Sequence, residues 1–134
     1  MTFKSRRVRW ILIGAGALIA AALLAAFVFV SLGIGAGVRA ASNQAMLQHE
    51  GDRVEALLRF VEDSRHSLAD RNRAVWALGQ LGDPRALPVL RKYYAGEPCD
   101  HRTALCQREL GRAIKLAEGG VNVTALVWRN PAAK

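Results

Sequence analysis

An uncharged stretch of 29 residues, from Trp10 to Val38, constrains this chain more than any other feature. It contains 23 hydrophobic residues, and the other six are five glycines and Ser31. As an α-helix rising 1.5 Å per residue it reaches roughly 43 Å, which exceeds the ~30 Å hydrocarbon core of a bilayer. The stretch therefore predicts one transmembrane helix over residues 10–38, surrounded by membrane lipid. It excludes a wholly soluble protein and a transporter with many spans.

The two flanks of this stretch differ in charge. The N-terminal flank carries four basic residues, namely Lys4, Arg6, Arg7 and Arg9. The other flank has Arg39 and then no Lys or Arg until Arg53. Because basic residues beside a span favour the cytoplasmic side, this asymmetry predicts a cytoplasmic N-terminus. The Arg- and Ala-rich composition is typical of a bacterial protein, so we expect a single pass through the inner membrane and a periplasmic C-terminal domain.

A cleaved signal peptide is the main alternative to a retained anchor. Arg39-Ala40-Ala41 follows the apolar stretch and offers small residues to a signal peptidase. Secretory apolar regions are about 7–15 residues long, and this one is about twice that length. We therefore predict a signal anchor that stays in the mature protein.

Small residues recur inside the predicted span at a spacing of four. Gly33 and Gly37 form one pair, and Ala17, Ala21 and Ala25 form a second series. Small residues one turn apart let a second helix approach closely within a membrane. Gly33 and Gly37 are therefore candidates for membrane helix packing, the alternative being that they are ordinary filler of a membrane helix.

The net charge of +8 raises the question of a nucleic-acid partner. Four of the 19 basic residues lie in the N-terminal flank, which leaves 15 basic residues against 11 acidic ones in the rest of the chain. Charges of opposite sign are interleaved there, as in Asp52-Arg53 and Asp70-Arg71. Such interleaving is typical of a solvated mixed surface, so we predict no nucleic-acid partner.

Beyond the span, apolar residues recur with helical spacing. In the first segment the positions i, i+3, i+4 and i+7 are Val54, Leu57, Leu58 and Val61. Asp83-Pro84 is a typical helix start, and Gly82 and Gly119-Gly120 are typical helix ends. Four helices are predicted: one from about residue 44 or 52 to 64, then 70–82, 84–96 and 100–118. The predicted fold class is all-α, with one membrane helix followed by about four short helices.

The short helices form an internal repeat. A shift of 32 residues places the segment 53–59 on 85–91 and Leu78-Gly79 on Leu110-Gly111. A shared offset of this size is typical of helical-pair repeats. The segment from Arg73 to Leu90, RAVWALGQLGDPRALPVL, resembles the short HEAT-like repeat of phycobilisome lyases. The flanking half-repeats match more loosely, and no Gly-Asp-Pro follows the fourth helix, so the array is expected to end there.

The resemblance implies a short α-solenoid with a protein-binding role and implies no reaction. Each helical pair buries its apolar face on its neighbours, and roughly three repeats are normally needed for stability. Two repeats leave burial to be completed by a cap, a disulfide, the membrane or a partner. The chain is divided into a cytoplasmic basic leader (1–9), a transmembrane signal anchor (10–38), a linker or helix extension (39–51), a HEAT-like domain (52–118) and a C-terminal tail (119–134).

Together these features predict a membrane-anchored interaction or scaffold element on the outer side of the bacterial inner membrane. The expected partner is another protein or a second copy of this chain. The sequence contains no evident catalytic set or phosphate-binding loop, so we predict neither an enzyme nor a cofactor nor a resident metal. The alternative, implied by the resemblance to lyases, is a cofactor-attachment or assembly factor.

Cys99 and Cys106 are the only cysteines, and an exported domain meets an oxidising compartment. A disulfide closing this eight-residue loop contributes on the order of 2.5 kcal/mol in the chain-entropy model, and we take it as the preferred interpretation. One alternative is a buried thiol at Cys106 with Cys99 free. Another is a metal site that includes His101, which lacks a clear fourth ligand.

Four side chains are candidates for contacting a partner: Trp76, Arg73, Tyr94 and Trp128. Trp76 lies off the apolar stripe of its helix, among polar neighbours, with Gly79 leaving room for close packing. Tryptophan and arginine are enriched in binding hot spots. The alternative for Trp76 is packing against an adjacent helix.

Two further expectations concern residues outside the repeat motif. His49 and His66 lie among polar residues, and we expect both to be solvated. The tail at 121–128 is rich in β-branched residues, which indicates an extended segment that covers the last helix or offers an edge to a partner strand.

Overall fold

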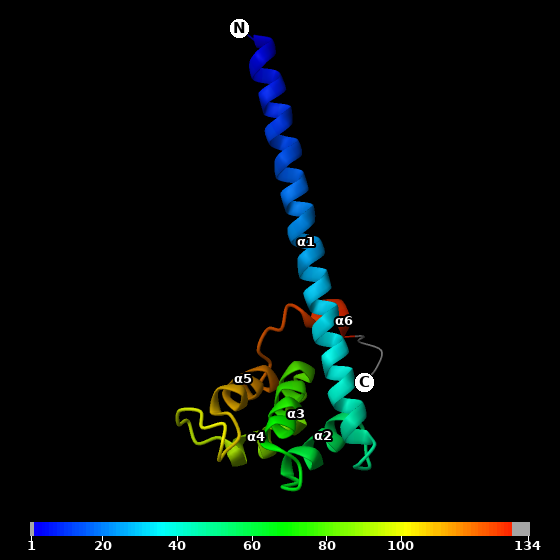
Figure 1. The fold of residues 1–134 in the computed structure, drawn as a ribbon, viewed down its shortest axis with the longest axis vertical. Coiled ribbons are helices and arrows are strands. Elements are labelled where there is room, and N and C mark those ends of the chain that lie inside the picture. The colour runs from blue at the N-terminus through cyan, green and yellow to red at the C-terminus, as the bar shows by residue number, and fades with distance from the viewer. Residues whose placement is uncertain (1, 130–134) are drawn as a thin grey trace.

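The computed structural model describes residues 2–129, apart from the side chains of residues 2–5 and residue 7, and every regular element in that range is helical (Figure 1). The elements are α1 (Thr2–Met46), α2 (Arg53–Glu62), α3 (Leu68–Leu81), the 3-10 helix η1 (Pro84–Ala86), α4 (Leu87–Tyr93), α5 (Gln107–Ala117) and α6 (Ala125–Trp128). A long apolar N-terminal helix thus leads into several shorter packed helices. The predicted all-α fold is confirmed.

Helix α1 consists of an exposed half and a packed half. All residues from Val8 to Val30 are exposed, and from Ser31 onward one face is buried. The buried positions recur every three or four residues: Ser31, Gly35, Val38, Ala41, Ser42 and Ala45. The hydroxyl of Ser31 donates to the carbonyl of Phe27 at 2.7 Å, which satisfies this polar group where the buried face begins. The second half of α1 is therefore part of the helical domain.

The segment Val8–Met46 is the one helix among the described residues whose length and composition suit a membrane span. Only 6% of its most apolar window is buried by the rest of the chain. The sequence predicted a span that continued to residue 38 and a linker or extension from residue 39. In the structure the helix runs on to Met46, and residues 31–38 already pack against the domain.

Two tryptophans dock on glycines of α1. A Cβ atom added to Gly35 would lie 2.6 Å from Cβ of Trp128, and one added to Gly37 would lie 3.0 Å from Cη2 of Trp76. The indole groups therefore occupy space that any larger residue on α1 would fill. Gly33 has no neighbour within 4 Å of an added Cβ. The two glycines predicted to act as a pair thus differ, because Trp76 of the same chain packs against Gly37 while Gly33 is exposed.

The helices from α2 to α5 form two stacked pairs. Helices α2 and α3 make the first pair, and η1, α4 and α5 make the second, with α3 packed on both α2 and α5. Leu78 and Leu110, which the 32-residue shift superimposed, are both fully buried. Helix α1 packs on α2 and α3, where a preceding repeat would stack. The second half of α1 therefore covers one end of the stacked helices.

Local signals place the helix boundaries of the repeat. The side chain of Asp52 accepts from the backbone N–H groups of Val54 and Glu55, and Glu55 bonds back in a capping box. Helix α3 ends at Gly82, whose φ of 63° is a left-handed conformation that glycine adopts without strain. Asp83 then caps η1 through the N–H of Arg85. These boundaries lie within about two residues of the predicted ones.

Three predictions about the later part of the chain and the histidines are wrong. The fourth helix begins at Gln107 instead of about residue 100, because Asp100 closes a separate turn by accepting from Arg102 and Thr103. The tail forms the short helix α6, which packs against α1 instead of extending over α5. His49 and His66 are partly buried, with side chains 12% and 16% exposed.

The docking of α1 predicts opposite effects for two neighbouring glycines. Gly35→Ala should lower the free energy of unfolding by about 1–3 kcal/mol, because the new Cβ overlaps Trp128 near its backbone. Gly33→Ala should raise it by about 0.5–1 kcal/mol, because alanine is the better helix former and meets no neighbour there. Denaturant unfolding of the full chain in detergent, followed by circular dichroism, measures both. Equal effects of the two substitutions would contradict this packing.

Candidate functional site

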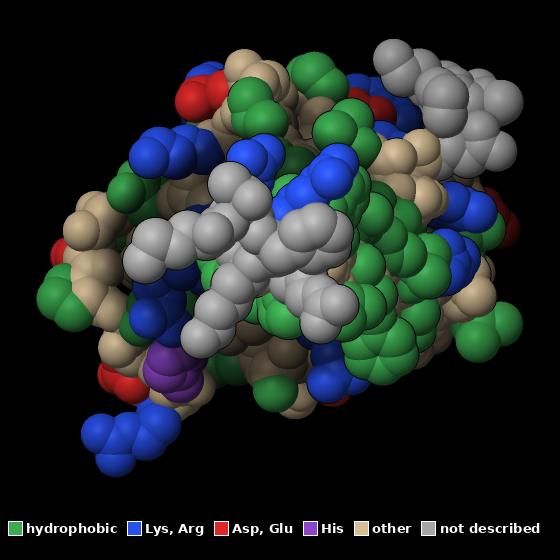
Figure 2. Space-filling model, turned by 90° about the horizontal axis from the view of Figure 1, so that it is seen from above, with side chains coloured by type: hydrophobic (Ala, Val, Ile, Leu, Met, Phe, Trp, Pro, Cys, Tyr) green, Lys and Arg blue, Asp and Glu red, His purple; other side chains and the backbone are tan. Residues whose placement is uncertain are grey.

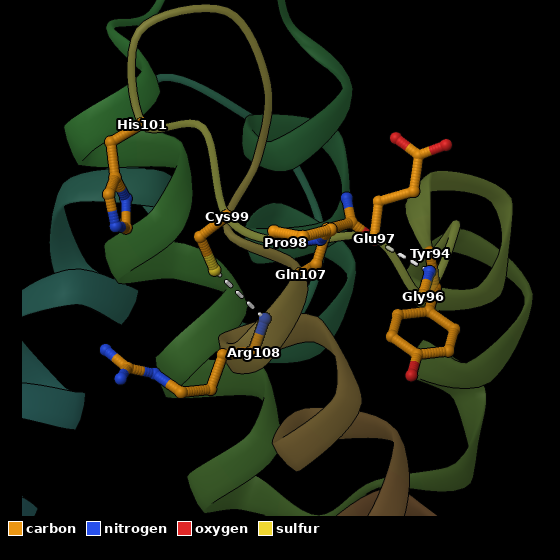
Figure 3. Close-up of a pocket in the computed structure, with 8 residues that line it drawn as sticks. All are labelled: Tyr94, Gly96, Glu97, Pro98, Cys99, His101, Gln107 and Arg108. Carbon is orange, nitrogen blue, oxygen red and sulfur yellow. Dashed lines mark hydrogen bonds between the residues drawn. The ribbon is translucent and has the colours of Figure 1, made fainter.

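The connection between α4 and α5 forms a pocket of about 370 Å³ at the start of α5. It is lined by Tyr94, Gly96, Glu97, Pro98, Cys99, His101, Gln107 and Arg108 (Figure 3). Figure 3 shows Tyr94 and Glu97 on one side of this set and Cys99, His101 and Arg108 on the other. The pocket therefore brings a thiol, an imidazole and the first turn of a helix together.

A buried glutamine holds this connection in shape. The Oε1 atom of Gln107 accepts from the N–H groups of Ala95 at 2.7 Å and Gly96 at 3.3 Å. Its Nε2 donates to the carbonyls of Tyr93 and Leu105, both at 3.1 Å. Gln107 was missed at the sequence level, because it was expected inside a longer helix, where a glutamine carries no distinguishing signal.

The start of α5 is anchored by a second polar residue from the preceding repeat. The Oδ1 atom of Asn72, in α3, accepts from the N–H of Cys106 at 2.8 Å. Cys106 is the N-cap residue of α5 and is almost fully buried. Cys106 therefore begins α5. The helix predicted from about residue 100 would have placed it two turns inside.

The two cysteines lie close together as free thiols. Their sulfur atoms and one ring nitrogen of His101 are all within 4.8 Å of one another. The predicted disulfide is not formed in the structure. The loop it was expected to close has a different geometry, because α5 begins at Gln107. A bridge would require the sulfur atoms to approach to about 2.0 Å.

The environment of Cys99 favours its thiolate. The pKa of Cys99 lies below its usual value, first because the thiol of Cys106 donates to it and second because the backbone N–H of Arg108 does. The Arg108 N–H to Sγ distance is 3.3 Å, and it places the sulfur at the N-terminus of α5. A thiolate in this position can act as a nucleophile, join a disulfide or, with Cys106 and His101, bind a thiophilic metal.

A second concavity, of about 280 Å³, lies between α3 and α5. Its lining consists of Trp76, Gly79 and Gln80 from α3 with Glu109, Arg112, Ala113, Lys115 and Leu116 from α5. We call it the α3/α5 groove. The helices approach closely here, because a Cβ on Gly79 would lie 2.8 Å from Cα of Ala113. The groove therefore has a tightly packed floor and a rim of charged side chains.

The four predicted partner-contact residues divide into two kinds. Trp76 and Trp128 are partly buried against Gly37 and Gly35 of α1, so their main contacts are internal. Arg73 is exposed on α3, and Tyr94 is exposed at the pocket rim, where its ring lies 3.4 Å from a Cβ placed on Gly111. The structure therefore does not gather the four into one patch.

One known family matches a part of this helical domain. The PBS lyase HEAT-like repeat family matches residues 70–96, which extend from α3 through α4. Neither a curated protein nor a solved structure matches the chain. The chain therefore contains a HEAT-like repeat within a small helical domain.

The thiol environment predicts the reactivity of Cys99. Alkylation of Cys99 should be half-maximal at a pH below that of an ordinary thiol, about 8.5, because hydrogen bonds, first of all that from Cys106, favour its thiolate. Cys106→Ala removes one donor and should move this midpoint to higher pH. Cys106→Ser retains an O–H donor and should shift it less. Peptide mapping of the alkylated full chain over a pH series measures all three; unchanged midpoints would contradict the assignment.

Proposed function

We propose that this chain is a single-pass membrane protein whose HEAT-like module holds a protein partner at the outer surface of the bacterial inner membrane. The observation that carries the proposal is the continuity of α1, which runs unbroken from an exposed apolar half into the core of the domain. A helix of this kind ties the position of the module to that of the anchor.

The length of the exposed half suits a bilayer. From Trp10 to Val30 there are 21 residues, which reach roughly 32 Å as a helix, close to the ~30 Å hydrocarbon core. The uncharged stretch read from the sequence was longer than a span requires. The residues beyond Val30 that made up this excess pack against the domain. Arg6 and Arg9 at the opposite end favour a cytoplasmic N-terminus.

The helical domain starts where the exposed half of α1 ends. This supports a position of the domain directly at the membrane surface. Helix α6 lies beside α1 at this point, and the segment before it runs there from α5 (Figure 1). Val121, Val123 and Leu126 are exposed there, Leu126 to 83%. Seen from above, hydrophobic side chains gather on one side of the centre of this face, and Lys and Arg side chains are spread around it (Figure 2). Such a face suits the interfacial region of a bilayer.

The α3/α5 groove is the surface we assign to the partner. Arg112 and Lys115 are exposed on its rim, and the nearest acidic group, Glu109, is bound to Arg112 at 3.3 Å. Arg73 adds a further exposed cation on α3. A partner segment with acidic residues around an apolar centre complements this groove, because the floor is apolar and the rim is basic.

We propose a binding role and not a catalytic one. A second candidate, a cofactor-attachment or assembly factor, is favoured by one observation, the thiolate-stabilising environment of Cys99. The two functions differ in what Cys99→Ser does. An attachment factor loses function with this change, whereas a binding module retains its partner.

The topology has a direct test. Alkaline phosphatase fused after the last residue should be active, and a fluorescent protein fused there should be dark, because the C-terminal domain is exported. Replacing all four basic residues before Trp10 with glutamine should reduce the active fraction of the phosphatase fusion. A bright fluorescent fusion with an inactive phosphatase would reverse the proposed orientation.

The partner surface is tested by cross-linking in cells. A photo-cross-linking amino acid in place of Gln80, in the α3/α5 groove, should capture one discrete neighbour. The same amino acid in place of Arg59, exposed on α2, is the matched control and should capture none. Arg112→Glu combined with Lys115→Glu should abolish capture at position 80, because it reverses the charge of the rim. Equal capture at both positions would count against the groove.

A further inference from the structure

A second cluster of metal-ligating side chains, His49, Asp63 and His66, lies near the C-terminal end of α1. His49 follows α1, where its backbone N–H donates to the carbonyl of Ala45 at 2.9 Å. Asp63 is the C-cap residue of α2, and His66 lies in the turn before α3, with its N–H donating to the carbonyl of Asp63 at 3.2 Å. Two connections, one after α1 and one between α2 and α3, thus bring the three side chains together.

The three ligand atoms form a small triangle. The Nε2 atoms of His49 and His66 are 3.4 Å apart, and they lie 3.8 and 3.6 Å from Oδ2 of Asp63. Tetrahedral zinc, with bonds of about 2.0–2.2 Å to nitrogen and oxygen, separates its ligand atoms by about 3.3–3.5 Å. The nitrogen pair already has this separation. A shift of a few tenths of an ångström by the carboxylate completes the set.

The imidazole rings are held in place before any ion binds. Phe60, which is 3% exposed, stacks on His66 with ring centroids 3.7 Å apart and planes 5° from parallel. The same phenyl ring meets His49 edge-on at 5.9 Å. All three ligand side chains are only 12–16% exposed. This packing keeps both Nε2 atoms within 3.8 Å of one carboxylate oxygen, and such preorganisation is what a metal site requires.

One cation competes for the carboxylate. Arg65 donates to Asp63 through Nε at 3.0 Å and through Nη2 at 2.6 Å. The side chain of Arg65 is 85% exposed whereas that of Asp63 is 12% exposed, so the guanidinium can leave the carboxylate for water without disturbing the packed residues around it. A divalent ion bound by two imidazoles can displace it, and the guanidinium then lies free in water.

We propose that His49, Asp63 and His66 form a binding site for a divalent transition metal, with zinc as the occupant and water in the fourth position. Imidazole and carboxylate ligands of this kind suit zinc. The bound ion ties the end of α1 to the connection between α2 and α3, and so fastens the helical cap to the first repeat. This site is separate from the α3/α5 groove and from the Cys99 pocket.

The test uses the full chain in detergent with Cys99→Ser and Cys106→Ser, which removes the other cluster of metal-ligating side chains. After treatment with a chelator, zinc is titrated against a chromophoric competitor. We expect one zinc ion per chain, and His66→Gln or Asp63→Asn should weaken its binding at least about tenfold. His101→Gln, which removes the third histidine of the chain, is the matched control and should leave the affinity unchanged.

A further variant separates ligand loss from loss of the fold. Arg65→Gln removes the competing cation from an exposed position and should tighten zinc binding severalfold, an effect that misfolding does not produce. Circular dichroism of each variant monitors the helices. The proposal is overturned if the cysteine-free chain binds no zinc, if His66→Gln and Asp63→Asn bind it as tightly as His101→Gln does, or if Arg65→Gln leaves the affinity unchanged.

Discussion

The structure depends on the contact between the second half of α1 and the helical repeat. Two large indole groups, from Trp76 and Trp128, lie against Gly37 and Gly35, where the absence of a Cβ lets them reach the helix backbone. Aromatic side chains bury more apolar surface than other residues, so a few such contacts hold a long helix in one orientation. Small residues complete the buried face at Ala41 and Ala45.

This contact also covers an end of the short helical array. Each helical pair in a solenoid buries one face on its neighbour, and the terminal pairs need a cap. Here α1 covers α2 and α3, so the first pair is buried on both sides. The same helix carries the exposed apolar half, and its continuity joins the two parts without a flexible linker. The cap and the proposed anchor are therefore one element.

The thiol and imidazole side chains lie in or next to the connections between helices, whereas the apolar core is formed by the helices themselves. The Cys99 pocket is shaped by Gln107 and Asn72, whose amide groups satisfy the backbone of a long connection. The histidine cluster is shaped by Phe60, which orients both rings. In each case a rigid helical core fixes the loop residues around it, which is how helical scaffolds commonly present functional groups.

The sequence by itself determined the helical class, the HEAT-like segment, the apolar helix and the boundaries marked by Asp52, Gly82 and Asp83. These features follow from short-range periodicity and capping, which nearby residues set. Only the tertiary structure decided that Trp76 meets Gly37, that His49 and His66 share Asp63, and that residues 31–38 join the domain. Such contacts join residues distant in the chain, and they depend on how the helices pack, which no local pattern records.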